Sequence, residues 1–365
     1  VEGMSLISSV TLLFSKAIAA AFPEIAITPA ETLVAQNTNL KMKHDYQCNA
    51  AMGLCKKLQA KLGKDNAPKN PRECAQKIID NMPTSSMIEK VEMAGPGFIN
   101  MYLKKEWVSE SVKKILFRGC IPPPVERKRV VVDYSSPNIA KDMHVGHLRS
   151  TIIGDCLSRV LEFCGHEVLR INHVGDWGTQ FGMLIAHLED ISPDFENNPP
   201  SIEDLTVFYK QAKQKFDEDE AFRDRAHQEV VNLQSGKEKN IRMWKMLCSA
   251  SERLFSKVYK MLNVDPRLKM MGESFYNPLL PQMVKELDEK GLLKEDNGAK
   301  VLFPKGFDAP LIIQKKDGGF GYDGTDMTAL KYRIQELKAD WLIYVVDSGQ
   351  ALHFQQVFEA AREAG

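Results

Sequence analysis

A strand, a helix and a second strand in the middle of the chain constrain its fold more than any other feature. Arg129–Tyr134 is a β-branched run of a length typical of a buried strand, and Val168–Ile171 is another. Between them, Val145–Cys164 has the apolar spacing of a helix, and Gly165 is a typical stop signal. The apolar residues that indicate this helix are Ile152, Ile153, Cys156, Leu157, Val160, Leu161 and Cys164. A helix that joins two buried strands implies parallel strands, so we expect an α/β fold with a doubly wound parallel sheet.

A run of prolines marks the clearest domain boundary. Ile121–Pro124 favours an extended backbone, so residues 121–129 are predicted to be a linker. Residues 130–189 and 306–365 would form the two halves of the parallel-sheet domain, and the charged, helical residues 190–305 an insertion between them. Further helices are expected at Asp204–Phe216, Glu220–Ser235, Ser249–Leu262 and Ala351–Ala364, and strands at Gly298–Pro304 and Trp341–Val346.

Residues 1–120 are predicted to form a small, separate α+β module. Residues 88–103 have the pattern of two strands joined by a Gly-Pro-Gly turn. Helices are expected at Leu6–Ala21, Tyr46–Leu62, Arg72–Asn81 and Lys104–Leu116. The apolar N-terminal run contains Lys16 and has no basic segment before it, so we interpret it as a packed helix rather than a signal peptide. No stretch is long and apolar enough to span a bilayer, and no membrane partner is expected.

Charge and cysteine usage narrow the possible partners. The 48 basic and 48 acidic side chains cancel, so a nucleic acid would have to bind a local basic patch. None of the seven cysteines forms a Cys-x-x-Cys pair, and their number is odd. This usage predicts reduced thiols in an intracellular protein, without a zinc site or a disulfide framework.

The sharpest chemical signal is His144-Val145-Gly146-His147, at the expected start of the helix that follows the first strand. Helix N-termini favour phosphate, and both imidazoles could donate hydrogen bonds to ATP oxygens as pyrophosphate leaves. Gly146 would let a purine or ribose approach the backbone. The alternatives are a metal-binding pair or two surface histidines, although two histidines alone are too few ligands for zinc.

The residues around this signal resemble those of arginyl-tRNA synthetases, which are class I aminoacyl-tRNA synthetases. Ser135–Thr151 and Asn172–Gly182 are similar to the signature pair of that family. The similarity continues through Gly95–Leu103, Glu273–Tyr276, Lys315–Asp326 and Tyr344–His353, and so spans nearly the whole chain. The resemblance implies a Rossmann-type catalytic domain after a tRNA-contacting module in residues 1–120. It also places the mobile lysine-serine loop and the helical anticodon-binding domain beyond residue 365, so this chain is expected to be incomplete as an enzyme.

The resemblance also implies the chemistry. Such a ligase uses ATP with Mg²⁺ to convert L-arginine to arginyl adenylate, and then transfers the arginyl group to tRNA(Arg) for protein biosynthesis. It implies a cytoplasmic location, with an organellar form left open, and other synthetases in a complex as further partners. Bound tRNA is expected to be required before arginine is activated.

Five residues match positions that hold arginine in this family. Asn138 would bind the α-amino group, and Gln350 the amino group or the carboxylate. Asp133 would help to read the substrate cation, while Tyr322 and Asp326 would frame the guanidinium. A carboxylate suits that planar group because it can accept two parallel N–H bonds. From the sequence alone, Asp326 could equally cap a helix over Met327–Leu337.

The other matching positions concern ATP and tRNA. His144, Gly146 and His147 would bind the nucleotide, and the resemblance puts His353 near the adenosine. Lys141 would reach the β- or γ-phosphate, unless it is a solvated loop lysine. Phe98 and Asn100 would stack on and bond an unpaired base of tRNA, although Phe98 could also be a core residue of its strand.

Two other functions stay open at this point. One is a small-molecule adenylyltransferase with the same histidine signature, which would need neither the N-terminal module nor the insertion. The other is a non-catalytic scaffold for tRNA or for an assembly. The intact His144, His147, Lys141 and Asn138 argue against a scaffold, whereas the missing C-terminal part argues for one.

Overall fold

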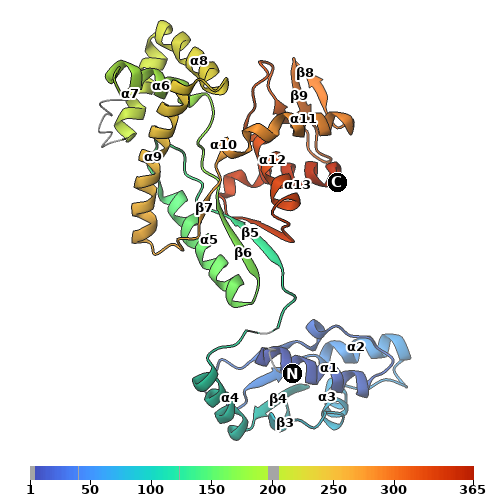
Figure 1. Cartoon of the computed structure of the whole chain (residues 1–365). Coiled ribbons are helices and arrows are strands. Elements are labelled where there is room, and N and C mark those ends of the chain that lie inside the picture. The colour runs from blue at the N-terminus through green and yellow to red at the C-terminus, as the bar shows by residue number, and fades with distance from the viewer. Residues whose placement is uncertain (1–4, 40, 123, 196–204) are drawn as a thin grey trace. The chain divides into compact units, whose positions relative to one another are not determined.

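The structure, a computed structural model, describes residues 5–39, 41–122, 124–195 and 205–365 (Figure 1). It divides into two compact units, Val1–Val125 and Glu126–Gly365. Pro123 of the expected linker and Asp204, the expected start of a helix, lie outside the described residues. Within the described part of the chain, no helix is both long and apolar enough to cross a membrane.

The first unit packs helices against a four-stranded antiparallel sheet of order β1-β2-β4-β3. Its elements are α1 (Leu6–Ala21), η1 (Pro29–Thr32), β1 (Val34–Gln36), β2 (Tyr46–Cys48), α2 (Ala51–Leu62), α3 (Pro71–Asp80), β3 (Ile88–Ala94), β4 (Phe98–Leu103) and α4 (Lys105–Arg118). The prediction of one helix over Tyr46–Leu62 is wrong. Its first residues are β2 instead, because they pair with Ile99–Met101 of β4 and bury Tyr46 and Cys48.

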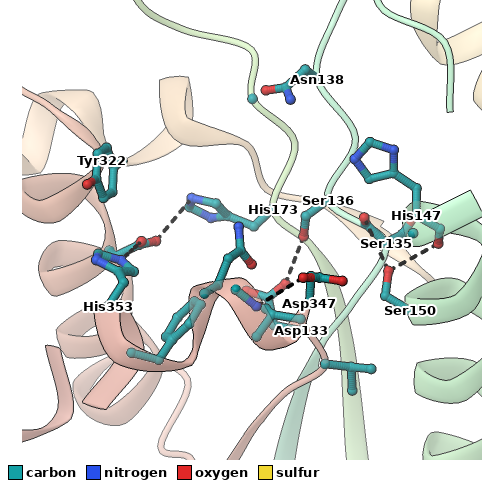
Figure 2. Close-up of a pocket in the computed structure, with 18 of the residues that line it drawn as sticks. Asp133, Ser135, Ser136, Asn138, His147, Ser150, His173, Tyr322, Asp347 and His353 are labelled. Atoms are coloured by element: carbon teal, nitrogen blue, oxygen red, sulfur yellow. Dashed lines mark hydrogen bonds and ion pairs between the residues drawn. The ribbon is translucent and has the colours of Figure 1, made fainter. Parts of the chain in front are cut away.

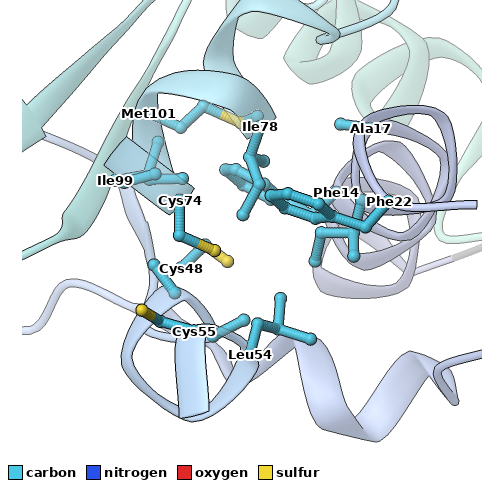
Figure 3. Packing of buried hydrophobic residues seen from close by; sticks show 14 of the residues in the cluster. Phe14, Ala17, Phe22, Cys48, Leu54, Cys55, Cys74, Ile78, Ile99 and Met101 are labelled. Carbon is cyan, nitrogen blue, oxygen red and sulfur yellow. The ribbon is translucent and has the colours of Figure 1, made fainter. Parts of the chain in front are cut away.

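Side chains of strand β4 alternate between the core of this unit and the outer face of the sheet. Ile99 and Met101 point into the core, where Figure 3 shows them beside Ile78 of α3 and near Phe14 of α1. The intervening Phe98, Asn100 and Tyr102 are only half-buried. The core also holds three free cysteines, and burial raises the pKa of Cys48 to about 11 and that of Cys74 to about 12. These thiols are therefore protonated at neutral pH.

The second unit is built on a parallel sheet of order β11-β5-β6-β7. Its strands are β5 (Arg129–Asp133), β6 (Glu167–Asn172), β7 (Lys269–Met270) and β11 (Trp341–Tyr344). The chain adds β6 and β7 on one side of β5, and β11 on the other. Such a reversal leaves a crevice beyond the carboxyl ends of β5 and β11, where α/β proteins bind their ligands.

Helix α5 (Val145–Phe163) follows β5 and packs on the sheet with an unexpected face. Its buried residues are small or polar: Thr151, Gly154, Asp155 and Ser158. Gly154 is required there, because a Cβ at that position would overlap the ring of Tyr134. Most of the apolar residues that predicted the helix point outward instead, and Ile152, Ile153, Cys156, Leu157 and Val160 are exposed.

The described residues between β6 and β7 form four helices: α6 (Gln180–Ile191), α7 (Leu205–Glu218), α8 (Glu220–Gln234) and α9 (Glu238–Met261). Their apolar faces form one core, which also receives Ile139 and Ala140 from the loop between β5 and α5. Helix α9 begins eleven residues before the expected Ser249, because Met243 and Leu247 continue its buried face.

After β7, the chain adds a small subdomain before it returns to the parallel sheet. Its elements are α10 (Glu273–Tyr276), η2 (Asn277–Leu279), α11 (Leu280–Glu289), β8 (Lys294–Asp296), β9 (Ala299–Leu302) and β10 (Leu311–Gln314). The three strands form an antiparallel sheet of order β10-β9-β8. Helix α12 (Tyr322–Gln335) leads to β11, and η3 (Ser348–Gln350) and α13 (Ala351–Ala364) end the unit.

Candidate active site

A cavity of about 710 Å³ lies at the crevice between β5 and β11. Residues that follow β5, β6 and β11 line it, together with the first turns of α5 and α12. Nine of the predicted site residues line this cavity: Asp133, Asn138, His144, Gly146, His147, Tyr322, Asp326, Gln350 and His353. Figure 2 shows His147 and Ser150 at one end, Tyr322 and His353 at the other, and His173 and Ser136 between them.

The two signature histidines cap helix α5. The Nδ1 atom of His144 accepts a hydrogen bond from the Gly146 N–H at 3.1 Å, and Nδ1 of His147 accepts one from the His144 N–H at 3.3 Å. Their rings stack with centroids 3.8 Å apart. Because each Nδ1 is an acceptor, we assign the ring proton of both residues to Nε2, which leaves two Nε2–H donors at the helix start.

Burial, followed by the nearby His144, lowers the pKa of His147 to about 4. This imidazole is therefore neutral at physiological pH, and it can donate through Nε2–H without carrying a charge. Gly146 is also explained by this geometry, because a Cβ there would lie 2.9 Å from Cε1 of His144. A larger residue would push the capping ring aside.

The opposite end of the cavity is acidic. The carboxylate of Asp326 lies between two imidazoles, 2.7 Å from Nε2 of His353 and 3.6 Å from Nε2 of His173. The ring of Tyr322 stands edge-on to that of His353, with centroids 4.9 Å apart. The alternative that Asp326 caps a helix is wrong, because α12 begins at Tyr322 and places Asp326 in its second turn.

His353 was expected near the adenosine, and its contacts point elsewhere. Besides Asp326, its ring faces Asp323, with Nδ1 3.4 Å from the carboxylate. The helix α13 thus directs His353 toward the acidic end of the cavity, and the residues that it touches give no support to an adenosine contact.

Asp133 already has a cationic partner inside the protein. One carboxylate oxygen lies 2.7 Å from Nη2 of Arg333, and the other accepts a hydrogen bond from Ser136 Oγ at 3.2 Å. Both Asp133 and Arg333 are buried. The expected contact of Asp133 with a substrate cation is therefore not supported, because Arg333 balances its charge and fixes α12 against the end of β5.

Lys141 does not line the cavity. Its Nζ lies over the ring of Tyr209 in α7, 5.0 Å from the centroid, in a cation–π contact. The side chain is exposed at the edge of the insertion, so reaching a phosphate would require it to leave Tyr209.

Among the cavity residues that the sequence reasoning missed are His173 and Glu273, although both lie in segments that carry the resemblance. His173 directly follows β6, and Glu273 begins the short helix after β7. Burial, and then the carboxylates of Asp176 and Asp326, raise the pKa of Glu273 to about 8. The rule that ligands bind beyond the ends of parallel strands could have found His173. It could not have found Glu273, because the two residues of β7 give no strand pattern.

Two family models together match nearly the whole chain. Residues 111–365 match the family model for the catalytic domain of class I tRNA synthetases (R), and residues 9–103 match that for the arginyl tRNA synthetase N-terminal domain. The chain belongs to the arginyl-tRNA synthetase family.

Curated relatives and solved structures agree with this assignment. The chain is 51% identical to a cytoplasmic arginine–tRNA ligase of Xenopus tropicalis over 97% of its length, and 48% identical to that of Homo sapiens over 99%. It covers 52% and 54% of those proteins, so it spans about half the length of the curated relatives. Arginyl-tRNA synthetase of Plasmodium falciparum has the same fold with a TM-score of 0.84 and 35% identity, over all of this chain and 63% of that one. The Thermus thermophilus enzyme superposes with a TM-score of 0.61 at 22% identity, over 91% of this chain and 53% of its own, and supports the fold alone.

The two tRNA candidates lie in the range that matches the arginyl tRNA synthetase N-terminal domain. Phe98 and Asn100 occupy alternate positions of β4, away from the face that carries Ile99 and Met101. The alternative of a core Phe98 is wrong, because its side chain is only half-buried. Asn100 accepts a hydrogen bond from Nε2 of Gln47 at 2.8 Å, which fixes its amide on the outer face of the sheet.

Proposed function

We propose that this chain is the part of an arginine–tRNA ligase that binds ATP and L-arginine and forms arginyl adenylate, whose arginyl group then passes to tRNA(Arg). One observation carries the proposal: a single cavity has two Nε2–H donors at a helix start and a carboxylate cluster at its other end. The donors suit a phosphate chain, and the carboxylates suit a guanidinium.

In this proposal Asp326 and Glu273 bind the guanidinium, and Tyr322 covers its plane. Asn138 and Gln350 bind the α-amino end, which orients the arginine carboxylate toward the α-phosphate of ATP. Asp133 contributes by holding Ser136 and Arg333 in place rather than by touching the substrate. A lysine side chain, with one compact charge, could not satisfy two carboxylates in the same way.

Catalysis is then positioning and charge stabilisation. The arginine carboxylate oxygen attacks the α-phosphorus, the bond from that phosphorus to the bridging oxygen breaks, and pyrophosphate leaves. Negative charge on the phosphate oxygens grows along this path, so the Nε2–H donors of His144 and His147 bind the transition state more strongly than the substrate. No enzyme nucleophile is involved. Lys141 joins the phosphate site only if it moves away from Tyr209.

Mg²⁺ is expected to arrive with ATP. Among the described residues there is no group of three or more histidines, cysteines, aspartates or glutamates that could hold a metal ion. The ion would therefore be bound mainly by phosphate oxygens and water, which is the usual mode for Mg²⁺ at nucleotide sites.

The N-terminal unit would bind tRNA(Arg) through the outer face of β4, with Phe98 stacking on an unpaired base.

The cellular location is inferred from the relatives. The curated relatives are named as cytoplasmic ligases, which supports a cytoplasmic location for this chain as well. Contacts with other synthetases are compatible with this proposal, and an organellar form is the alternative location.

Arginine-dependent exchange of pyrophosphate into ATP tests the proposed function. We expect exchange with arginine and tRNA(Arg), and less without tRNA, in a form extended at its C-terminus to the length of the relatives. This chain alone should bind arginine and ATP in calorimetry, with weaker exchange. Ligand binding by neither form would leave the non-catalytic scaffold as the better function, whereas exchange with another small acid would favour a different adenylyltransferase.

Glu273 should make arginine binding depend on pH. Because its pKa is about 8 in the empty site, its carboxyl is protonated below that pH, and a guanidinium must displace the proton. Arginine affinity should therefore rise between pH 6 and pH 8, by up to about tenfold per unit, and level off above. Glu273→Gln should bind more weakly and lose this slope. Calorimetry at pH 6, 7 and 8 measures the arginine affinity of both proteins. An equal change of affinity with pH in the parent and in Glu273→Gln would refute the role of Glu273.

Gly175→Ala should displace Asn138. A Cβ at position 175 would overlap the Asn138 amide oxygen, because the two backbones pair as neighbours across the loop. We expect arginine affinity to fall about tenfold, on the scale of one lost hydrogen bond to a charged group, with ATP affinity nearly unchanged. Gly53→Ala in the other unit is the control, because a Cβ there meets no atom within 4 Å. Gly178→Ala would not serve as a control, because the φ of 121° at Gly178 strains any residue with a Cβ.

A further inference from the structure

The loop between β5 and α5 is held in a strained conformation. Ser135, Ser136 and Ala140 have φ angles of 78°, 49° and 61°, in the left-handed region that residues with a Cβ rarely adopt. Such conformations persist only where the surroundings fix them. The same loop carries Asn138 and leads directly into the cap formed by His144. Whatever holds the loop therefore also sets the positions of Asn138 and of the histidine cap.

The first brace is a hydrogen-bond network around Tyr259 of α9. Its Oη lies 2.7 Å from Ser135 Oγ and accepts a hydrogen bond from Nδ2 of Asn172 at 2.9 Å. The Oδ1 atom of Asn172 accepts the Ser136 N–H, also at 2.9 Å. Thr151 of α5 donates to Ser135 Oγ at 2.8 Å. Two left-handed residues are thus tied to α9, to the end of β6 and to α5.

The second brace is Ser251, also on α9. Its Oγ accepts the Ala140 N–H at 3.0 Å and donates to the Leu247 carbonyl at 3.1 Å. Ser251 and Ala140 are fully buried, and Ile139 beside them packs in the core of helices α6–α9. Without Ser251 Oγ, a buried backbone N–H of a left-handed residue would lose its partner.

We propose that Tyr259 and Ser251 are positioning residues of the reaction, and that α9 holds the β5–α5 loop in the conformation that presents Asn138 and the two histidines. This proposal rests on the function proposed above. Neither residue lines the cavity, so both act through the loop. Helix α9 is thereby a structural part of the site, although none of its residues lines the cavity.

Two variants on α9 test the proposal in the C-terminally extended form. Tyr259→Phe removes one hydroxyl and keeps the ring, and Ser251→Ala removes one hydroxyl from the same helix. We expect each to lower arginine affinity and the rate of pyrophosphate exchange about tenfold. Ser256→Ala, which changes an exposed serine of α9, should alter neither. Thermal unfolding of all variants shows whether a loss follows stability instead of position.

A glycine substitution in the β5–α5 loop is the decisive experiment. Glycine adopts the left-handed region without steric cost, so Ala140→Gly should restore most of the activity lost in Ser251→Ala. It should not restore Tyr259→Phe, because the bond lost there lies at the other end of the loop. Because Ala140→Gly also relieves strain that costs stability, rescue of exchange supports positioning where the melting temperatures of Ser251→Ala and of the double variant are equal.

The outcomes separate the two proposals. Normal arginine binding and exchange in Tyr259→Phe and Ser251→Ala, or a loss that Ala140→Gly leaves unchanged, would overturn the positioning role while the function stands. A parent protein that binds neither ligand would overturn the function and the positioning role together. Selective rescue supports both.

Discussion

Asp326→Ala is expected to weaken arginine binding by about 2–4 kcal/mol, the largest loss of affinity for any single substitution in this cavity. In the proposed function this carboxylate and Glu273 face the guanidinium, and two imidazoles hold Asp326 in place. Removing it leaves the nearby Glu273, and burial together with the carboxylate of Asp176 still raises the pKa of Glu273 above its ordinary value. The Glu273 carboxyl should therefore offset only part of the lost charge.

Calorimetric titration with arginine measures this effect, and titration with ATP on the same sample is the internal control. Asp326→Asn separates charge from shape, because the amide fills the same space and should still lose most of the affinity. Asp317→Asn, in the exposed turn after β10, is the matched control. Unaltered arginine affinity in the Asp326 variants would remove this residue from the site.

His147→Ala is expected to slow arginine-dependent pyrophosphate exchange by a factor of about 10² to 10³, while arginine binding stays nearly normal. Loss of a single donor aimed at developing charge has effects of this size. The loss should appear mainly in kcat, because the charge that Nε2–H meets is greatest in the transition state. The low pKa of the ring predicts that the parent enzyme needs no protonated His147 above pH 5.

The control for His147→Ala is His227→Ala, which changes an exposed histidine on α8 and should leave the rate of pyrophosphate exchange unaltered. His147→Asn is a useful second variant, since its amide can still donate a hydrogen bond and should recover part of the rate. If His147→Ala exchanged pyrophosphate as fast as the parent, the phosphate role assigned to the cap of α5 would be wrong.

The sequence pattern predicted those helices and strands whose own hydrophobic residues determine them. The strand of β-branched residues after Arg129, the helix after His144 and the strand after Trp341 are each defined by their own hydrophobic pattern. Parallel strands meet at one sheet edge, so the residues that follow them were expected to gather. Nine of the twenty residues that line the cavity were named on that basis together with the family resemblance.

Contacts between distant segments could not be predicted in this way. Tyr46–Cys48 is a strand because it pairs with β1 and with β4, and β4 lies more than fifty positions later. Helical spacing correctly placed α5 but gave no indication of which face packs on the sheet, since that depends on Tyr134 filling the space beside Gly154. The pairing of Asp133 with Arg333 likewise joins residues far apart in sequence, and it changes the role expected for the carboxylate.

The arrangement of β5 beside β11 also has a consequence for how the molecule folds. Arg129 and Asp340, which hydrogen-bond where these strands begin, are 211 positions apart, so the closing contact of the sheet carries a large loop-closure entropy. We expect β11 to join late and slowly, after the segments between have collapsed. A nascent chain released before that point would have no crevice, and addition of arginine or ATP should raise the melting temperature only of molecules in which the last strand has docked.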